Sequence, residues 1–149
     1  MAVQATSEIV IEAPPEAIME ALADMDAVPS WSPVHKRVEV VDKHPDGRPH
    51  HVRVTIAVTG IHDTELLEYH WGPDWMVWDA HKTAQQRGQH GEYTLEREGE
   101  DRTRVRFAIT VEPSAPLPEF WVKRARKKIL HAALEGLRER VMRDAGPAG

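Results

Sequence analysis

Residues 105–143 read VRFAITVEPSAPLPEFWVKRARKKILHAALEGLRERVMR, an alternating segment that ends at a proline-rich break and continues as one long helical segment. Apolar residues recur at every second position before the break, as expected of a strand with one buried face. After it, they recur every three or four positions from Glu119 to about Arg143, which predicts a helix with one apolar stripe. Because such a stripe must be buried, the helix is expected to lie on the inner face of a sheet.

The sheet itself is predicted from residues 34–112, which alternate between apolar and polar residues and are divided into six strands by turn signals. These signals lie at residues 45–47, 59–60, 72–74, around Gly88, and at 98–101. A first strand over residues 6–13 precedes two short helices, over 15–24 and 26–31. We therefore predict an α+β fold in which a seven-stranded, curved antiparallel sheet, in the order β-αα-β6-α, wraps around the long C-terminal helix.

The composition limits which kinds of protein and which kinds of functional site this chain can form. The chain has 149 residues, 41% of them apolar and 29% charged, a net charge of −5 and no cysteine. These values predict one globular domain over residues 1–149, with a disordered tail from about 144. Disulfides, thiolate-held metals and a cysteine nucleophile are excluded. The mildly acidic balance gives no reason to expect nucleic acid as a partner.

Segments that target or anchor a protein are not predicted. The first residues lack the basic start and apolar core of a secretory signal. No uncharged apolar run approaches the roughly 20 residues of a transmembrane helix. The expected location is therefore the cytoplasm.

Three local motifs carry a resemblance to a known family: IEAPPEA at residues 11–17, GEYTL at 91–95, and VEP at 111–113 followed by PLP at 116–118 and a basic last helix. With the order of elements, they resemble the SRPBCC superfamily, the START/Bet v 1-like helix-grip proteins, and within it the actinobacterial polyketide cyclase/dehydrase-like group. The resemblance covers essentially the whole chain. It implies a cavity between the sheet and the last helix that holds a hydrophobic small molecule.

Residues 61–71 also indicate a cavity. Leu67, Tyr69 and Trp71 share one face of this strand, which is expected to point inward, and the same alternation places Asp63 and Glu65 on that face. A carboxylate turned toward a core is costly unless it is paired or hydrated. We considered a cavity containing water, a strand end exposed to solvent, and a pair between Glu65 and Arg87. Both faces of residues 74–79 are apolar, so the sequence does not assign Trp75 or Trp78 to the inside.

Strand alternation and the resemblance together give the predicted binding residues. Trp31 and Trp78 are expected near the mouth of the cavity. The full predicted lining is Trp31, Val54, Ile56, Leu67, Tyr69, Trp78, Tyr93, Phe107, Ile109, Trp121, Ala125 and Ile129.

Evidence for catalysis in the sequence is weak. None of the four serines lies in a Gly-x-Ser-x-Gly elbow, and no glycine-rich phosphate loop is present. General acid–base chemistry could use Glu65, Tyr69 or Tyr93, with Asp79 as a further candidate. No cofactor is predicted.

Nine histidines raise the question of a metal site. The pairs considered are His50 with His51, His62 with His70, and His81 with His90, and none has the helical spacing of His-Glu-x-x-His. Alternation assigns four histidines to the outer face of the sheet, and no metal site is predicted. These four are His35, His51, His62 and His70.

Five of the six residues from 123 to 128 are basic, near the start of the last helix, where the helix dipole does not favour cations. A solvated face and a contact with an anionic membrane or protein both fit this pattern. The five residues are Lys123, Arg124, Arg126, Lys127 and Lys128.

The principal functional hypothesis is binding or transport of a lipid-like, aromatic or polyketide-like hydrophobic molecule. One alternative is a polyketide cyclase or dehydratase. Another is an interaction module that uses the basic face of the last helix. The sequence favours binding over catalysis without deciding the question.

Overall fold

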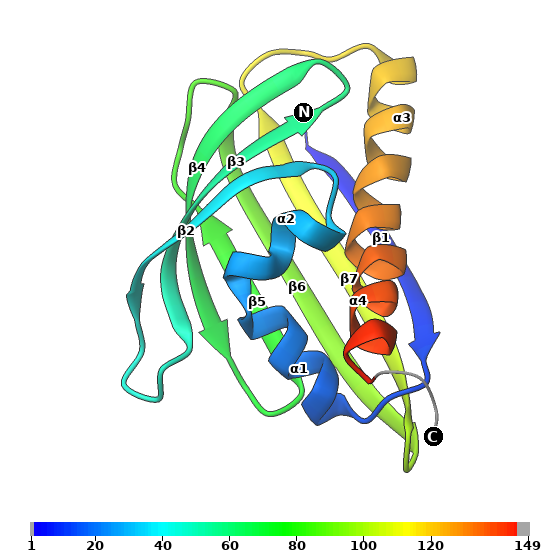
Figure 1. Ribbon diagram of the computed structural model, residues 1–149. Helices are drawn as coiled ribbons and strands as arrows, with labels where there is room; N and C mark the ends of the chain where they lie inside the picture. Colours follow the sequence, from blue (N-terminus) through cyan, green and yellow to red (C-terminus); the bar gives the residue numbers. More distant parts are fainter. Residues whose placement is uncertain (1, 146–149) are drawn as a thin grey trace.

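The computed structural model describes residues 2–145. Seven strands and a set of helical segments follow one another in the predicted order (Figure 1). The strands are β1 (Val3–Ile11), β2 (His35–Lys43), β3 (Pro49–Val58), β4 (Ile61–Trp71), β5 (Trp75–Ala80), β6 (Gln86–Gly99) and β7 (Arg102–Pro113). The helical segments are α1 (Pro15–Ala23), η1 (Met25–Ala27), α2 (Val28–Trp31), α3 (Glu119–Leu130), η2 (His131–Gly136) and α4 (Leu137–Asp144).

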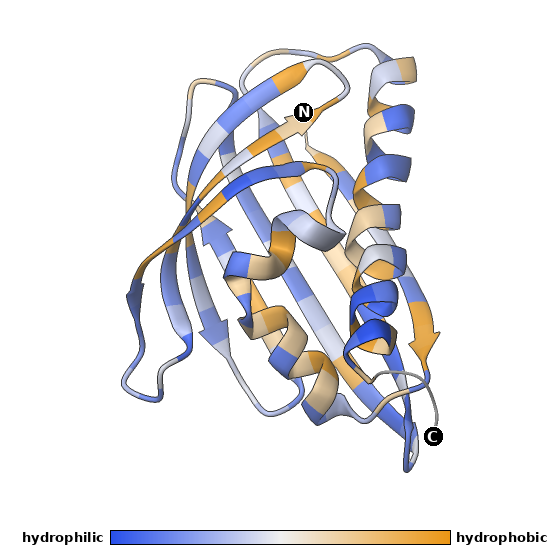
Figure 2. Ribbon diagram, in the orientation of Figure 1, coloured by the Kyte–Doolittle hydropathy of each residue, from blue (hydrophilic) through white to orange (hydrophobic). Residues whose placement is uncertain are grey.

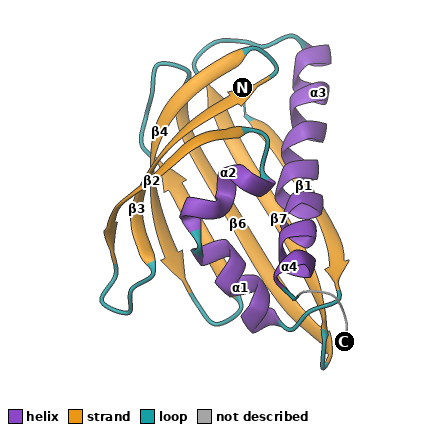
Figure 3. Cartoon of the chain, in the orientation of Figure 1, coloured by secondary structure: helices purple, strands orange, loops and turns teal. Residues whose placement is uncertain are grey.

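All seven strands form one antiparallel sheet in the order β1-β7-β6-β5-β4-β3-β2. The helices lie on one side of this sheet, with α3 and α4 along it and α1 and α2 beside them (Figure 3). Hydrophobic and hydrophilic residues alternate along the strands (Figure 2), which gives the sheet an inner and an outer face. The predicted helix-grip architecture is confirmed.

Three of the five predicted turn signals fall between strands, the signal at residues 98–101 overlaps the end of β6 and continues into the turn before β7, and the signal around Gly88 does not fall in a turn. The connection from β5 to β6 lies at residues 81–85, and Gly88 is within β6 beside a register shift between Gln86 and Gly88. Another shift lies between His35 and Arg37 in β2, and further shifts lie between Val40 and Lys43 and between Arg97 and Gly99. Each shift changes which residues face inward, since an extra residue in a strand reverses the alternation beyond it.

The last helix has a π-helical segment, η2, between α3 and α4. There the Tyr93 hydroxyl of β6 donates a hydrogen bond to the Ala133 carbonyl (2.8 Å). Gly136 lies so close to α2 that a Cβ atom would be 2.3 Å from the Trp31 carbonyl oxygen. A glycine at this position therefore allows the last helix to pack against α2.

Buried residues of the sheet, α1 and α4 form one continuous core, which includes Ile11, Ile18, Val105 and Leu137. No helix within residues 2–145 is both long enough and apolar enough to cross a bilayer. Asp144, assigned by the sequence prediction to a disordered tail, is instead the last residue of α4 and pairs with Arg140. Residues 146–149 of that predicted tail lie outside the described residues.

Candidate ligand-binding site

A cavity of about 200 Å³ lies between the inner face of the sheet and helix α3. This volume is far above the roughly 10–15 Å³ that one water molecule requires. Its walls are mostly apolar and come from β1 to β7, from α2 and from the last helix. The space is thus suited to an apolar molecule rather than to a few buried waters.

The structure places all twelve predicted binding residues around this one cavity. Trp78 is 7% exposed and faces it, whereas Trp75 is 39% exposed and lies against Gly72. The question that the sequence left open is settled in favour of Trp78. The twelve residues are Trp31, Val54, Ile56, Leu67, Tyr69, Trp78, Tyr93, Phe107, Ile109, Trp121, Ala125 and Ile129.

Trp78 lies against the backbone of the neighbouring strand at Gly91. A Cβ atom on Gly91 would be 2.0 Å from Trp78 Cζ2, so only glycine leaves room for the indole. The Trp78 ring lies 5.8 Å from Tyr69 and 6.0 Å from Phe107, between ring centroids. Gly91 therefore lets an aromatic wall form on the inner face.

A polar network crosses this wall on β4 and β6. Trp78 Nε1 donates to Gln89 Oε1 (2.8 Å), and Gln89 Nε2 donates to Glu65 Oε2 (3.3 Å). The Gln86 amide donates to Glu65 and to Asp63 Oδ2, the latter at 3.1 Å. Since Glu65, Gln86 and Gln89 all line the cavity, a bound molecule would meet these groups directly.

Glu65 is a buried carboxyl without a cationic partner in the described part of the chain. It is 3% exposed. Burial, reinforced by the nearby Asp63, raises the pKa of Glu65 to about 7. Near neutral pH the group is therefore present both as an acid that donates a hydrogen bond and as a carboxylate that accepts one.

The considered pair between Glu65 and Arg87 is wrong. Arg87 is exposed, and Gln86 occupies the inward position instead. The cause is the register shift between Gln86 and Gly88, which reverses the alternation that Tyr93 and Gln89 follow. Strand alternation alone missed Gln86, although Gly88 is a sequence signal for this shift, since an isolated glycine within a strand often marks a bulge.

The outward assignment of His35 is wrong for the same physical reason. His35 lines the cavity, and its Nδ1 lies 2.6 Å from the hydroxyl of the buried Ser32. The register shift between His35 and Arg37 turns it inward. Desolvation lowers the pKa of His35 to about 4, so the ring is neutral near pH 7.

The other candidates for acid–base chemistry differ in their surroundings. Burial raises the pKa of both Tyr69 and Tyr93, which keeps their hydroxyls protonated. The Tyr93 hydroxyl is occupied by the Ala133 carbonyl, so its contact is structural. Asp79 lies on the outer face, pairs with His90 (2.9 Å) and does not line the cavity.

The basic residues of α3 do not form a uniform surface. Lys123, Arg124, Lys127 and Lys128 are exposed, whereas Arg126 donates to the Gln4 carbonyl (2.8 Å) and lines the cavity. On the same helix, Trp121 donates to the Thr59 carbonyl (2.7 Å) and connects α3 to the turn after β3.

Solved structures share this architecture across nearly their whole length. A START superfamily protein from Mycobacterium smegmatis is 20% identical, with 95% of this chain and 98% of that one covered and a TM-score of 0.84. The Zhui aromatase/cyclase from Streptomyces sp. R1128 is 16% identical, with 100% and 99% covered and a TM-score of 0.85. Ginseng major latex-like protein 151 from Panax ginseng is 10% identical, with 95% and 98% covered and a TM-score of 0.67.

These structural likenesses show the fold, which also hosts proteins with different activities. No curated protein matches the chain. A family model described as polyketide cyclase/dehydrase and lipid transport matches residues 2–142, nearly the full length. The chain therefore belongs to the polyketide cyclase/dehydrase and lipid transport family, within the START-like SRPBCC proteins.

Proposed function

We propose that this protein binds, and thereby carries, one hydrophobic small molecule that bears at least one polar group. The observation that supports this most directly is the apolar cavity of about 200 Å³ with the Glu65 carboxyl in its wall. Apolar burial of the ligand would supply the driving force, at about 25 cal/mol for each Å² removed from water.

Two polar features favour a ligand with hydrogen-bonding groups over a pure hydrocarbon. Glu65 is buried at a cost in stability, because its carboxylate lacks a cation. Among the described residues, the buried Nε1 of Trp31 has no hydrogen-bond partner, although Trp31 lines the cavity. A ligand hydroxyl would donate to the Glu65 carboxylate, and a ligand oxygen would accept from the protonated Glu65 or from Trp31 Nε1, so each would satisfy a group that folding leaves under-satisfied. Lipid-like acids and aromatic, polyketide-like molecules carry such oxygens.

Mass spectrometry of the native protein would test the proposal by identifying what co-purifies with it. The purified chain would then be titrated with fatty acids and hydroxylated aromatic compounds. Trp31, Trp78 and Trp121 line the cavity, so their fluorescence should change on binding. A Trp75→Phe variant removes the outward tryptophan, and we expect it to retain this change.

A matched pair of variants tests the location. Ala125→Phe fills the cavity from α3, whereas Ala108→Phe places the same side chain on the outer face of β7. We expect a loss of at least about tenfold in affinity for the first variant and less than about twofold for the second. Equal affinities, or no ligand from the whole panel, would refute the proposed function.

A second candidate function, cyclase or dehydratase chemistry on a polyketide-like substrate, is favoured by Glu65 alone. A carboxyl with a pKa of about 7 in an apolar cavity is suited to general acid–base catalysis. In that case Glu65→Gln would abolish turnover of an aromatic polyketide substrate while leaving its binding nearly unchanged. If the protein acts only as a carrier, neither the wild type nor the variant would turn the substrate over.

A further inference from the structure

Histidines and carboxylates from β2, β3, β4 and the adjoining loops gather away from the cavity, whose lining includes none of them. Leu67 and Tyr69 face the cavity, so Glu68 and His70 of β4 point the other way. Across the ladder, His51 of β3 is the partner of Glu68, and it also pairs with Asp42 of β2. Strand pairing thus brings together residues that are far apart in the sequence. We call Asp42, His44, His50, His51, Glu68, His70 and His81 the outer histidine cluster.

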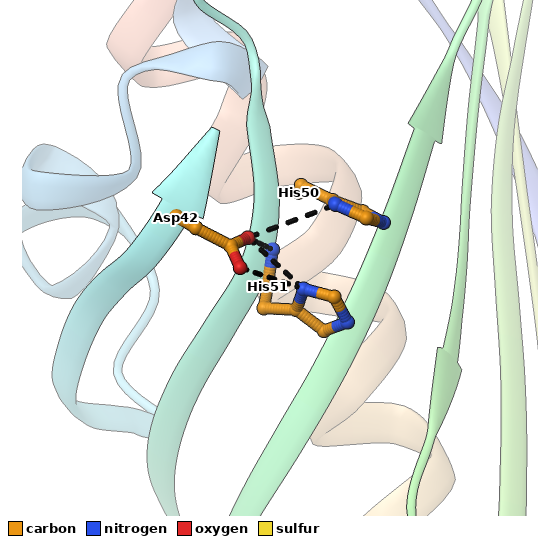
Figure 4. A group of neighbouring side chains, drawn as sticks. All are labelled: Asp42, His50 and His51. Atoms are coloured by element: carbon orange, nitrogen blue, oxygen red, sulfur yellow. Dashed lines mark hydrogen bonds and ion pairs between the residues drawn. The ribbon is translucent and has the colours of Figure 1, made fainter. Parts of the chain in front are cut away.

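Distances within the outer histidine cluster are short. His51 Nδ1 lies 2.9 Å from Asp42 Oδ1, and His50 Nδ1 lies 3.7 Å from the same oxygen (Figure 4). Glu68 joins the other side, 3.3 Å from His51 Nε2 and 2.9 Å from His70 Nε2. Three sets of ligand atoms each lie within 4.8 Å of one another: Asp42, His50 and His51; His50, Glu68 and His70; and His51, Glu68 and His81.

These separations are close to those of a metal site. Zinc ligands lie about 2.0–2.2 Å from the ion in a tetrahedron, which places them about 3.4 Å apart. Small rotations of exposed and half-buried side chains would reach that geometry. Among the described residues, every ion pair of Asp42 and Glu68 is made with a histidine, so no lysine or arginine neutralises these two carboxylates.

We propose that the outer histidine cluster binds one divalent transition-metal ion, with Zn²⁺ as the best match, through His50, Glu68 and His70. Two imidazoles and one carboxylate are a donor set that zinc prefers, whereas Mg²⁺ and Ca²⁺ prefer oxygen ligands. Three protein ligands leave a fourth position for water or a further group.

Residues around these three ligands hold the rings in place. Asp42 lies beside His50 Nδ1, and Figure 4 shows the other ring nitrogen of His50 on the side of the ring away from Asp42. His44 Nε2 donates to the Tyr69 carbonyl (2.7 Å), and its ring lies 4.2 Å from that of His50. Such outer partners orient the imidazole of a metal ligand. The ion would connect β3 to β4 directly behind the cavity wall at Tyr69.

The outer face also provides a matched control. His90 lies between Asp79 (2.9 Å) and Glu92 (3.4 Å), so it too is a histidine with two carboxylates. However, it belongs to none of the three sets that could hold an ion. A His90→Ala variant therefore removes one outer histidine of similar exposure without altering the proposed site.

The test uses the full chain without a histidine tag, treated with chelator and titrated with Zn²⁺ by calorimetry at pH 7.5. We expect one ion per chain, a higher melting temperature with Zn²⁺, and no comparable effect of Mg²⁺. His70→Ala, at an exposed position, should weaken Zn²⁺ binding by about 10–100-fold, and Asp42→Asn by about tenfold, while His90→Ala changes it less than about twofold.

Circular dichroism would establish that each variant is folded before titration. The proposal is overturned if the wild type and His70→Ala bind Zn²⁺ with the same affinity. It is also overturned if His90→Ala lowers the Zn²⁺ affinity as much as His70→Ala does. It is also overturned by several weak ions per chain that none of the variants affects. Substitution with Co²⁺ gives a second readout, since its visible absorption should change between the wild type and His50→Ala.

Discussion

Glu65 and Glu68 lie three residues apart on β4, and the two faces of the strand give them opposite properties. On the inner face, burial raises the pKa of Glu65 to about 7. On the outer face, a hydrogen bond with His70 lowers the pKa of Glu68 from its usual value. The same side chain is thus partly protonated on one side and a carboxylate paired with histidines on the other.

Under the two proposals made above, the two faces of the sheet would bind different classes of ligand. The inner face is mostly apolar and carries uncharged amide and indole donors, so it suits a neutral or weakly acidic organic molecule. The outer face is wet and gathers imidazoles around carboxylates, so it suits a cation. A two-faced antiparallel sheet makes this separation possible within one strand.

The largest effect on stability is expected at Gly91, where the inner face leaves no space beside Trp78. Gly91→Ala would place a Cβ atom 2.0 Å from the Trp78 ring, whereas the same change at Gly88 meets no atom within 4 Å. We expect Gly91→Ala to lower the free energy of unfolding by about 3 kcal/mol and Gly88→Ala to change it by less than about 0.5 kcal/mol. Urea denaturation measures both. Similar losses at the two positions would show that the inner wall is not tightly packed.

The second largest effect is the pH dependence of stability that the buried carboxyl of Glu65 causes. The pKa of Glu65 is higher in the folded protein than in the unfolded chain, so stability falls as the pH rises from about 4.5 through about 7. Glu65→Gln removes this loss. We expect it to raise the free energy of unfolding by about 2 kcal/mol at pH 8 and to have little effect at pH 5.

The control for this variant is Glu92→Gln on the outer face, where the carboxylate is 44% exposed. Its effect should stay within about 0.5 kcal/mol at both pH values. Denaturation curves at pH 5 and pH 8 measure both variants. A stabilisation by Glu65→Gln that is equal at the two pH values would contradict the raised pKa.

Much of the fold follows from the sequence, because most strands alternate between an apolar and a polar face and the long helix has a single apolar stripe. Alternation correctly turned Asp63, Glu65 and Tyr69 inward on the regular strand β4. It failed at His35 and Gln86, where register shifts add a residue to one strand. A shift depends on the pairing of two strands, and the sequence of one strand alone does not specify it.

The outer histidine cluster was missed for a related reason. His51 and Glu68 are neighbours only because β3 and β4 pair in one register. Of the three histidine pairs named from the sequence, only His50 with His51 lies in one group, together with Asp42. The structure groups His70 and His81 with Glu68, rather than with His62 and His90. Ligands that come from separate strands have no fixed spacing, in contrast to ligands on one helix.

His35 on the inner face and His90 on the outer face should titrate in different pH ranges. Desolvation lowers the pKa of the inward His35 to about 4, whereas a hydrogen bond with Asp79 raises the pKa of the outward His90. In an NMR titration, the His35 ring signals should move only below about pH 5, and those of His90 above pH 6.5. As the pH falls from 6.5 to 4, His35 should lower the stability of the fold. If the titration midpoints of His35 and His90 coincide, the two faces do not differ in how they shift the pKa of a histidine.

The smallest effect is expected on α3, which has its own inner and outer sides. Ala125 lines the cavity, whereas Lys127 and Lys128 are exposed. Exchanging both lysines for glutamate should change the affinity for a cavity ligand less than about twofold, since exposed charges act weakly through water and salt. A chain that instead uses its basic face to bind partners would bind phosphatidylserine vesicles in a salt-dependent manner, and the double variant would abolish that binding. Vesicle co-sedimentation at low and high salt, beside the ligand titration, measures which side of the helix meets the partner.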